Sequence, residues 1–272
     1  MLLKTNGDIL IDSIKINFDT EGLWILNIAL AVIMFGVALS IKIDDFKLLI
    51  KKPKILLVGV FSQFFLLPAL TFVAILIIKP HPSFALGMMM IAACPGGNIS
   101  NFFSKMAKGN SALSVSLTAF ATVICLLMTP LNLQFYSGLY EPTNEIIKTV
   151  QLDPIELFKL VLLILGIPIV LGMLLNHYFE EISRKIEVLL KPFSIIIFLT
   201  LIMIAFYDNI DVFLNYIHLV AGLVIFHNIG AYFIGFYTAK IFGLEKRDRK
   251  TICMETGIQN GGLGLLLIFQ FF

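Results

Sequence analysis

The sequence predicts an all-α membrane protein, a polytopic helical bundle. Of its 272 residues, 58% are hydrophobic and only 14% are charged, and the mean hydropathy is +0.94. A soluble domain carries about 25% charged residues, so no soluble fold could bury this much apolar surface. The apolar residues also gather in stretches of about 20, the length that an α-helix needs to cross the hydrocarbon core of a bilayer.

Eight such stretches follow one another along the chain. They cover residues 23–41, 54–78, 83–106, 111–136, 154–176, 186–207, 215–241 and 249–272. The loops between them are short, which predicts a single transmembrane domain over 23–272. The preceding segment, 1–22, has no basic region followed by an apolar region, so we expect no cleaved signal peptide. Instead, we expect it to lie at the outer membrane interface.

The positive charges predict how the bundle is oriented. If the N-terminus lies outside, only five of the 20 Lys and Arg residues fall on the external side, and the other fifteen are cytoplasmic. Cytoplasmic loops of membrane proteins are enriched in Lys and Arg, so we expect this orientation in a cell membrane. The basic residues lie in short loops rather than on one continuous patch, which argues against nucleic acid as a partner. We expect a monomer surrounded by the lipid bilayer.

Two of the eight stretches are not ordinary helices. The third contains Ala-Ala-Cys-Pro-Gly-Gly-Asn at residues 92–98, and the eighth contains Glu-Thr-Gly-Ile-Gln-Asn-Gly-Gly at 255–262. Proline and paired glycines interrupt helices, and irregular backbone at membrane depth must be buried in protein or line a cavity. Because the two stretches enter from opposite sides, we predict an inverted repeat with two discontinuous helices, as in secondary transporters. The alternative is two kinks in a packed bundle, which need no polar side chains.

Glu255 is the first candidate functional residue, because an ionisable group deep in a membrane is costly and usually functional. Gln259 lies one helical turn further along, on the same face. Gly257 loosens the chain between them and frees the carbonyls of Thr256 and Ile258. Carboxylate, amide and carbonyl oxygens together suit a hard cation, and unwound backbone supplies cation ligands in transporters. As an alternative, Glu255 could sit near the inner interface and pair with a basic residue six or five positions earlier, Arg249 or Lys250.

Further polar side chains accompany the breaks. They are Asn98, Ser100 and Asn101 at the first break, Ser114, Thr118 and Thr122 at a spacing of four residues on the next stretch, and Gln63 on the second stretch. Helix packing is the alternative for the hydroxyl stripe and the lone amide, because small and hydroxylated residues favour close helix contacts. The half-helices would also direct their positive N-termini to mid-membrane, which suits an anion. The residues thus predict a cation-coupled carrier of an anion.

The two breaks resemble the signature motifs of the bile acid:sodium symporter family. Cys-Pro-Gly-Gly-Asn-Ile-Ser-Asn at 94–101 resembles the first crossing helix of that family, and Met-Glu-Thr-Gly-Ile-Gln-Asn at 254–260 resembles the second. The residues at 107–110 and 113–118 continue the similarity, as do Lys-Pro-Lys at 52–54 with Gln63 and Pro68. The resemblance covers 23–272 and is closest to the animal bile acid carriers with nine spans.

This resemblance implies two sodium sites and a division into two domains. The first site would use Ser100, Asn101, Ser114, Thr118 and Glu255; the second would use Gln63, Glu255, Gln259 and the carbonyls of Thr256 and Ile258. A core domain would cover about 54–136 and 215–272, and a panel domain about 23–41 and 154–207. Substrate would lie between them near the crossing, facing Asn98 and Asn260. The family has one more helix after the second crossing helix, so we expect that this chain is shortened at its C-terminus.

Together these features predict a sodium-coupled symporter of an organic anion, a bile acid or a similar steroid-like anion, that works by alternating access. A small carboxylate such as a keto acid or pantoate is the alternative substrate, and proton coupling through Glu255 is the alternative coupling. An intramembrane enzyme would need a partner for Glu255, yet no second carboxylate, metal cluster or nucleophile–base pair accompanies it. A transporter-shaped sensor is a further alternative of a different class.

Overall fold

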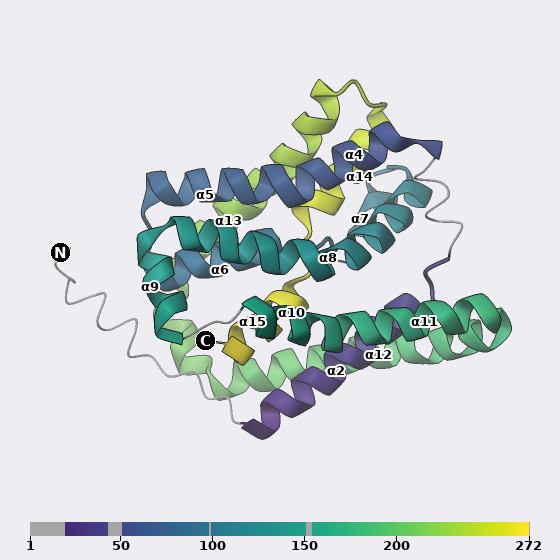
Figure 1. Cartoon of the computed structure of the whole chain (residues 1–272), viewed down its shortest axis with the longest axis horizontal. Coiled ribbons are helices and arrows are strands. Elements are labelled where there is room, and N and C mark those ends of the chain that lie inside the picture. The colour runs from purple at the N-terminus through teal and green to yellow at the C-terminus, as the bar shows by residue number, and fades with distance from the viewer. Residues whose placement is uncertain (1–19, 43–50, 98, 151–153, 272) are drawn as a thin grey trace.

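The computed structural model describes residues 20–42, 51–97, 99–150 and 154–271, and this part of the chain is all-α (Figure 1). Within these ranges no β-strand forms, and one isolated antiparallel bridge joins Gly96 to Gln259. The predicted all-α membrane bundle is therefore confirmed. The predicted N-terminal segment 1–22 falls almost entirely outside the described residues.

Each of the eight predicted stretches contains at least one helix. The elements are α2 (Thr20–Ala38), α4 (Pro53–Phe61), η1 (Ser62–Leu66), α5 (Leu67–Ile78), α6 (Pro82–Ala93), α7 (Ile99–Met106), α8 (Ser111–Leu139), α9 (Glu141–Val150), α10 (Pro154–Val161), η2 (Leu162–Gly166), α11 (Ile167–Tyr178), α12 (Glu180–Asp208), α13 (Ile210–Ile241), α14 (Lys246–Gly257) and α15 (Gly261–Phe271). The third and eighth stretches each contain two helices, and the first of these ends at Ala93 and Gly257, respectively, where the breaks were predicted.

Three helical segments of the described chain are long and apolar enough to cross a membrane. They are Pro53–Ile78, Ser111–Leu139 and Ile210–Ile241, and shorter apolar helices cover Asn27–Ala38, Pro82–Ala93 and Leu162–Tyr178. The helix α9 was not predicted, because its 10 residues include two glutamates and a lysine and are too short and polar to read as a span. Its Ile146 and Ile147 pack against the main hydrophobic core.

The helices form two groups that lie side by side (Figure 1). In one group, α13 packs along α14, and α6, α7 and α14 pack against α8, with α4 and α5 beside them. In the other group, α2 packs against both α11 and α12. An exposed ion pair, 2.6 Å from Lys42 Nζ to Glu180 Oε1, ties the end of α2 to the start of α12. The division into a core domain and a panel domain stays a prediction.

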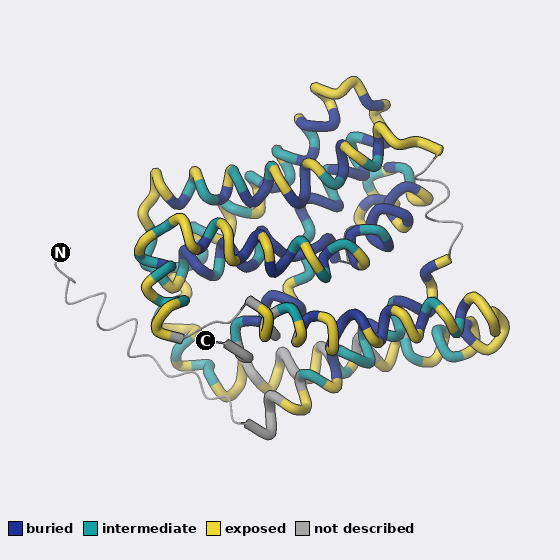
Figure 2. The backbone as a smooth tube through the Cα atoms, viewed as in Figure 1, coloured by how far each residue is buried: buried dark blue, intermediate teal, exposed yellow. Residues whose placement is uncertain are grey.

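Large apolar side chains cover the outer surfaces of the bundle. On α13, Val224, Ile225 and Phe226 leave between 51% and 59% of their surface exposed. Buried residues lie instead on the helix faces turned toward the neighbouring helices (Figure 2). A helix with apolar residues all around it is typical of a segment that faces lipid, because water would penalise so much exposed hydrocarbon.

The close packing of α13 on α14 depends on Gly235. A Cβ atom at this position would lie 2.7 Å from the Ile252 carbonyl oxygen and 2.9 Å from the Cys253 Cα, both backbone atoms of α14 that cannot rotate away. We therefore expect Gly235→Ala to destabilise the protein by about 1–3 kcal/mol, the usual penalty of overpacking. The measurement is the melting temperature in detergent.

Gly230→Ala on the same helix is the matched control. A Cβ there would meet no atom within 4 Å, so this variant should melt at the wild-type temperature or slightly higher, since alanine favours a helix over glycine by about 1 kcal/mol. Equal melting temperatures for the two variants would show that α13 and α14 can move apart freely.

Candidate functional site

The two helix breaks meet in space and pair with each other. Gly96 and Gln259 form the isolated antiparallel bridge. The Gly97 N–H donates to the Ile258 carbonyl at 2.8 Å, and the Asn260 N–H donates to the Pro95 carbonyl at 2.8 Å. Backbone that is not helical at membrane depth must satisfy its polar groups within the protein. Here backbone groups of each break hydrogen-bond to backbone groups of the other.

The glycines of the first break allow this close approach. A Cβ on Gly96 would lie 3.0 Å from both the carbonyl oxygen and the Oε2 of Glu255. A Cβ on Gly97 would lie 3.1 Å from the Gln259 carbonyl oxygen. Any side chain at these positions would push the second break, and with it Glu255, away from the crossing. Tertiary contact therefore favours glycine at both positions, in addition to the interruption of the helix.

Glu255 lies at the centre of the site, with only 3% of its surface exposed. Its Oε1 accepts hydrogen bonds from Ser100 Oγ at 2.6 Å and from Ser114 Oγ at 2.5 Å. Its Oε2 accepts from Thr118 Oγ1 at 2.8 Å, and this hydroxyl also lies 3.3 Å from Asn101 Oδ1. The structure thus brings together all five residues of the predicted first sodium site, from α7, α8 and α14.

The helix geometry explains why these residues meet. Ser114 and Thr118 are one turn apart on α8 and share the face that packs against α14. Thr122, the next hydroxyl of this stripe, donates to the Thr118 carbonyl at 2.7 Å instead. The Thr122 hydroxyl is thus bonded within its own helix, whereas the other two hydroxyls contact the carboxylate.

The basic residues near Glu255 bind elsewhere. Arg249 Nε donates to the Leu244 carbonyl at 2.5 Å, and Lys250 Nζ donates to the Ala107 carbonyl at 2.7 Å. No basic side chain in the described part of the chain forms an ion pair with Glu255. The alternative of an ion pair at the inner interface is therefore contradicted, and the carboxylate is surrounded by neutral oxygen-bearing groups.

The predicted second sodium site is assembled only in part. Gln63 Nε2 donates to Gln259 Oε1 at 3.4 Å, and Gln259 Nε2 donates to the Thr256 carbonyl at 2.6 Å. The Ile258 carbonyl instead accepts the Gly97 N–H across the crossing. A small cavity of about 10 Å³ lies beside this group, lined by Gly59, Val60, Gln63, Phe64, Leu117, Ala121 and Glu255. A space of this size can hold one water-sized particle.

Ser62 belongs to this region and was not predicted from the sequence. Its Oγ lies 3.0 Å from Thr256 Oγ1, and both side chains are fully buried. Both Ser62 and Gln63 lie in the π-helical turn η1, just before Pro68. Because proline has no N–H, the Phe64 carbonyl loses its helical donor, and Asn132 Nδ2 donates to it at 2.8 Å. A polar pair five or six residues before a membrane proline is the signal that could have revealed Ser62.

Of the two predicted substrate residues, Asn98 and Asn260, the structure describes only Asn260. Asn260 caps α15, since its Oδ1 accepts the Leu263 N–H at 3.2 Å. Asn98 lies outside the described residues. The helices α7 and α15 both begin at the crossing, so the positive ends of two helix dipoles converge there.

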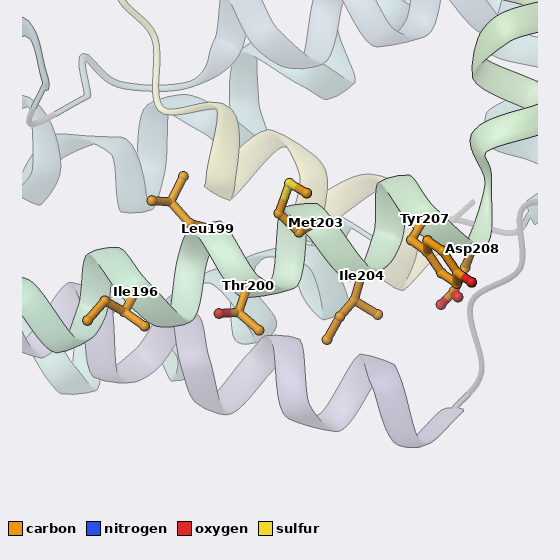
Figure 3. A pocket seen from close by; sticks show the side chains of 7 residues that line it. All are labelled: Ile196, Leu199, Thr200, Met203, Ile204, Tyr207 and Asp208. Atoms are coloured by element: carbon orange, nitrogen blue, oxygen red, sulfur yellow. The ribbon is translucent and has the colours of Figure 1, made fainter.

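A larger pocket, of about 620 Å³, lies along α12 (Figure 3). It is lined by Ile196, Leu199, Thr200, Met203, Ile204, Tyr207 and Asp208. None of these residues belongs to either predicted sodium site, and all of them come from one helix.

Comparison with known proteins gives a consistent result. The sodium bile acid symporter family matches residues 27–216. The uncharacterised sodium-dependent transporter YocS of Bacillus subtilis (strain 168) is 31% identical over 89% of this chain and 73% of its own length. The probable chloroplastic sodium/metabolite cotransporter BASS1 of Arabidopsis thaliana is 27% identical over 90% of this chain. The human ileal sodium/bile acid cotransporter is 30% identical over 87% of it.

This chain spans 59% of the length of the plant relative and 66% of the human one. The relatives are transporters rather than enzymes, and their names state sodium coupling, so the class of function is sodium-coupled transport. On the match over residues 27–216 and these similarities, the chain belongs to the sodium bile acid symporter family.

Proposed function

We propose that this protein is a symporter that moves an organic anion across the cell membrane together with two sodium ions. The observation that carries the proposal is the Glu255 carboxylate, which is 3% exposed and accepts hydrogen bonds from three hydroxyls at the crossing of the two half-helices. A buried carboxylate is costly unless charge or hydrogen bonds compensate it. A small cation at this point would neutralise it.

The first sodium ion would bind among Ser100, Asn101, Ser114, Thr118 and Glu255. Their functional atoms are all oxygens, which suits a hard monovalent cation. Each hydroxyl has lone pairs as well as one hydrogen, so it can turn its hydrogen away from the carboxylate and offer oxygen to the ion. The oxygens already converge on one carboxylate from α7 and α8, so little rearrangement is needed.

The second sodium ion would bind beside the small cavity, between Gln63, Gln259 and Glu255. The amide oxygen of Gln259 already points to Gln63, and the Thr256 carbonyl lies next to Gln259. The Ile258 carbonyl would contribute its second lone pair, since one is used by Gly97. Both sites would share Glu255.

The anion would bind at the positive N-termini of α7 and α15, with Asn98 and Asn260 facing it, between a core and a panel that alternate in access. A bile acid or a similar steroid-like anion is the proposed substrate, because one relative is named an ileal sodium/bile acid cotransporter. A small carboxylate is the second candidate, because the plant relatives are named sodium/metabolite cotransporters. We propose a monomer whose N-terminus lies outside the cell.

Sodium is expected to stabilise the purified protein, and potassium is not. A ligand that binds only the folded state, at a hundred times its Kd, adds about 2.7 kcal/mol of stability per site. For a protein of this size this raises the melting temperature by roughly 5 °C or more. The experiment compares melting curves in sodium, potassium and choline chloride at matched ionic strength and fixed pH.

Adding bile acids or small carboxylates to the sodium sample identifies the anion, because the true substrate should raise the melting temperature further. The same melting temperature in all three salts would contradict the proposed sodium sites. A melting temperature that depends on pH but not on sodium would point instead to proton coupling through Glu255.

A further inference from the structure

A second group of polar residues, buried or half-buried, lies one helical turn away from the candidate sodium site, on the same three helices. Ser104 follows Ser100 by four residues on α7, and Thr251 precedes Glu255 by four residues on α14. On α8, Asn110 caps the helix four residues before Ser114, with its Oδ1 accepting the Leu113 N–H at 3.2 Å. Each ligand-bearing helix therefore supplies one member to this second layer, which we call the lower layer.

Thr251 is the centre of the lower layer. Its Oγ1 accepts the Asn110 N–H at 2.8 Å and lies 3.1 Å from Ser104 Oγ. It also lies 3.2 Å from the Asn110 carbonyl oxygen. One hydroxyl thus joins α14 to both α7 and the start of α8, at the turn that connects those two helices.

Asp248 reinforces the same junction. Its Oδ1 accepts a hydrogen bond from Asn110 Nδ2 at 2.9 Å, although the side chain is only 5% exposed. The α7–α8 turn is also held by Lys250, whose Nζ donates to the Ala107 carbonyl at 2.7 Å. Hydrogen bonds to charged groups are roughly twice as strong as neutral ones. The turn is therefore attached to α14 by two charge-assisted bonds in addition to Thr251.

The fit at this junction is too close for an added side chain. A Cβ on Gly109 would lie 2.8 Å from both Ser104 Oγ and Thr251 Oγ1. The preceding residue, Lys108, has a φ of 57°, in the left-handed region, so the turn has a defined and unusual shape. Ser104 and Thr251 are themselves completely buried.

We propose that Thr251 and its partners are positioning residues that set the sodium affinity of the first site without touching the ion. This inference rests on the proposed function. The site needs oxygens from three helices in register, and the lower layer fixes that register one turn away from Glu255. Residues that orient the direct ligands of a metal affect its affinity strongly, by about 10–100-fold.

The test uses Thr251→Val, which removes the central hydroxyl and keeps the branched shape. We expect its half-saturating sodium concentration, read from the sodium dependence of the melting temperature, to rise about tenfold, in line with the effect of such orienting residues. Thr251→Ser should restore wild-type sodium binding to within about twofold, because it keeps the hydroxyl that makes these bonds. Ser104→Ala removes the other hydroxyl of the pair and is a milder change, and it should shift the sodium midpoint in the same direction. This variant replaces Thr251→Val in the test if Thr251→Val does not fold.

Thr143→Val is the matched control. Thr143 lies on α9 and is equally buried. Its hydroxyl donates to the carbonyl of Ser137 at 2.6 Å, and Ser137 lies at the end of α8 opposite to the lower layer. Thr143→Val should lower the melting temperature in choline as Thr251→Val does but leave the sodium midpoint unchanged. If Thr251→Val and Ser104→Ala keep the wild-type midpoint while the wild-type protein responds to sodium, the lower layer is purely structural and this inference is wrong. A wild-type protein without any sodium response would overturn the proposed function itself, and this inference with it.

Discussion

Replacing Glu255 with Gln is expected to abolish the sodium response of the protein while leaving it folded. Glu255 is the single charged ligand of both proposed sites, so one substitution removes the charge from both. Truncating one partner of a buried charge pair commonly costs 2–5 kcal/mol, so we expect sodium affinity to fall at least about a hundredfold, which equals about 2.8 kcal/mol. The fold should persist because glutamine keeps the shape, and its amide can still bond with Ser100, Ser114 and Thr118.

The measurement is the melting temperature of Glu255→Gln as sodium replaces choline. Two control variants should each damage one site only: Ser114→Ala at the first and Gln63→Ala at the second. Each should leave one sodium ion bound and lower the Hill slope of the sodium titration toward one. A Glu255→Gln variant with wild-type sodium affinity would mean that the carboxylate is structural and that no shared ligand exists.

Transport is expected to be electrogenic, because two sodium ions would accompany one monovalent anion. Each cycle would then move one net positive charge inward, and 100 mV acting on that charge supplies roughly 2.3 kcal/mol. A tenfold sodium gradient adds about 1.4 kcal/mol for each ion. The sum, about 5 kcal/mol, supports accumulation of the anion by several thousandfold. One sodium ion with a monovalent anion would be electrically neutral and would support only about tenfold accumulation.

The experiment measures uptake of a labelled anion into liposomes at fixed sodium gradient and at several imposed voltages. Uptake that rises with inside-negative voltage, with a sodium Hill slope above one, is the expected result. Voltage-independent uptake of a monovalent anion with one-to-one flux would contradict the two-site proposal while leaving symport itself intact. Repeating the assay with Gln63→Ala tests the second site, since transport by this variant should become electrically neutral.

Local sequence was sufficient to predict the class of fold and the two breaks, and the family resemblance supplied the set of residues around Glu255. Hydropathy over about 20 residues identifies membrane helices without tertiary information. Proline and paired glycines interrupt a helix wherever they occur, so the breaks after Ala93 and Gly257 could be placed in advance. The first sodium set rested on a motif resemblance together with the spacing of Ser114 and Thr118 on one helix face, and all five residues do meet in the structure.

Other features were decided by contacts between segments far apart in the chain. The sequence shows a hydroxyl stripe on α8, but only the packing of α14 against it makes Thr118 a partner of Glu255 and leaves Thr122 bonded to its own helix. Likewise, Ser62 lies 194 residues from Thr256 in the sequence, and nothing in the local pattern brings them together.

The same reason explains why the individual hydrogen bonds at the crossing, and those of the lower layer, could not be predicted. The antiparallel bridge between Gly96 and Gln259, and the bonds of Thr251 to Asn110, join residues more than 140 positions apart. A short polar side chain bonds whichever partner lies within about 3 Å, and that partner is chosen by helix packing. By itself, then, the sequence determined which segments form apolar helices, where two of them break and which side chains are candidates to bind a cation; the tertiary structure decided which oxygens converge on Glu255 and what holds them there.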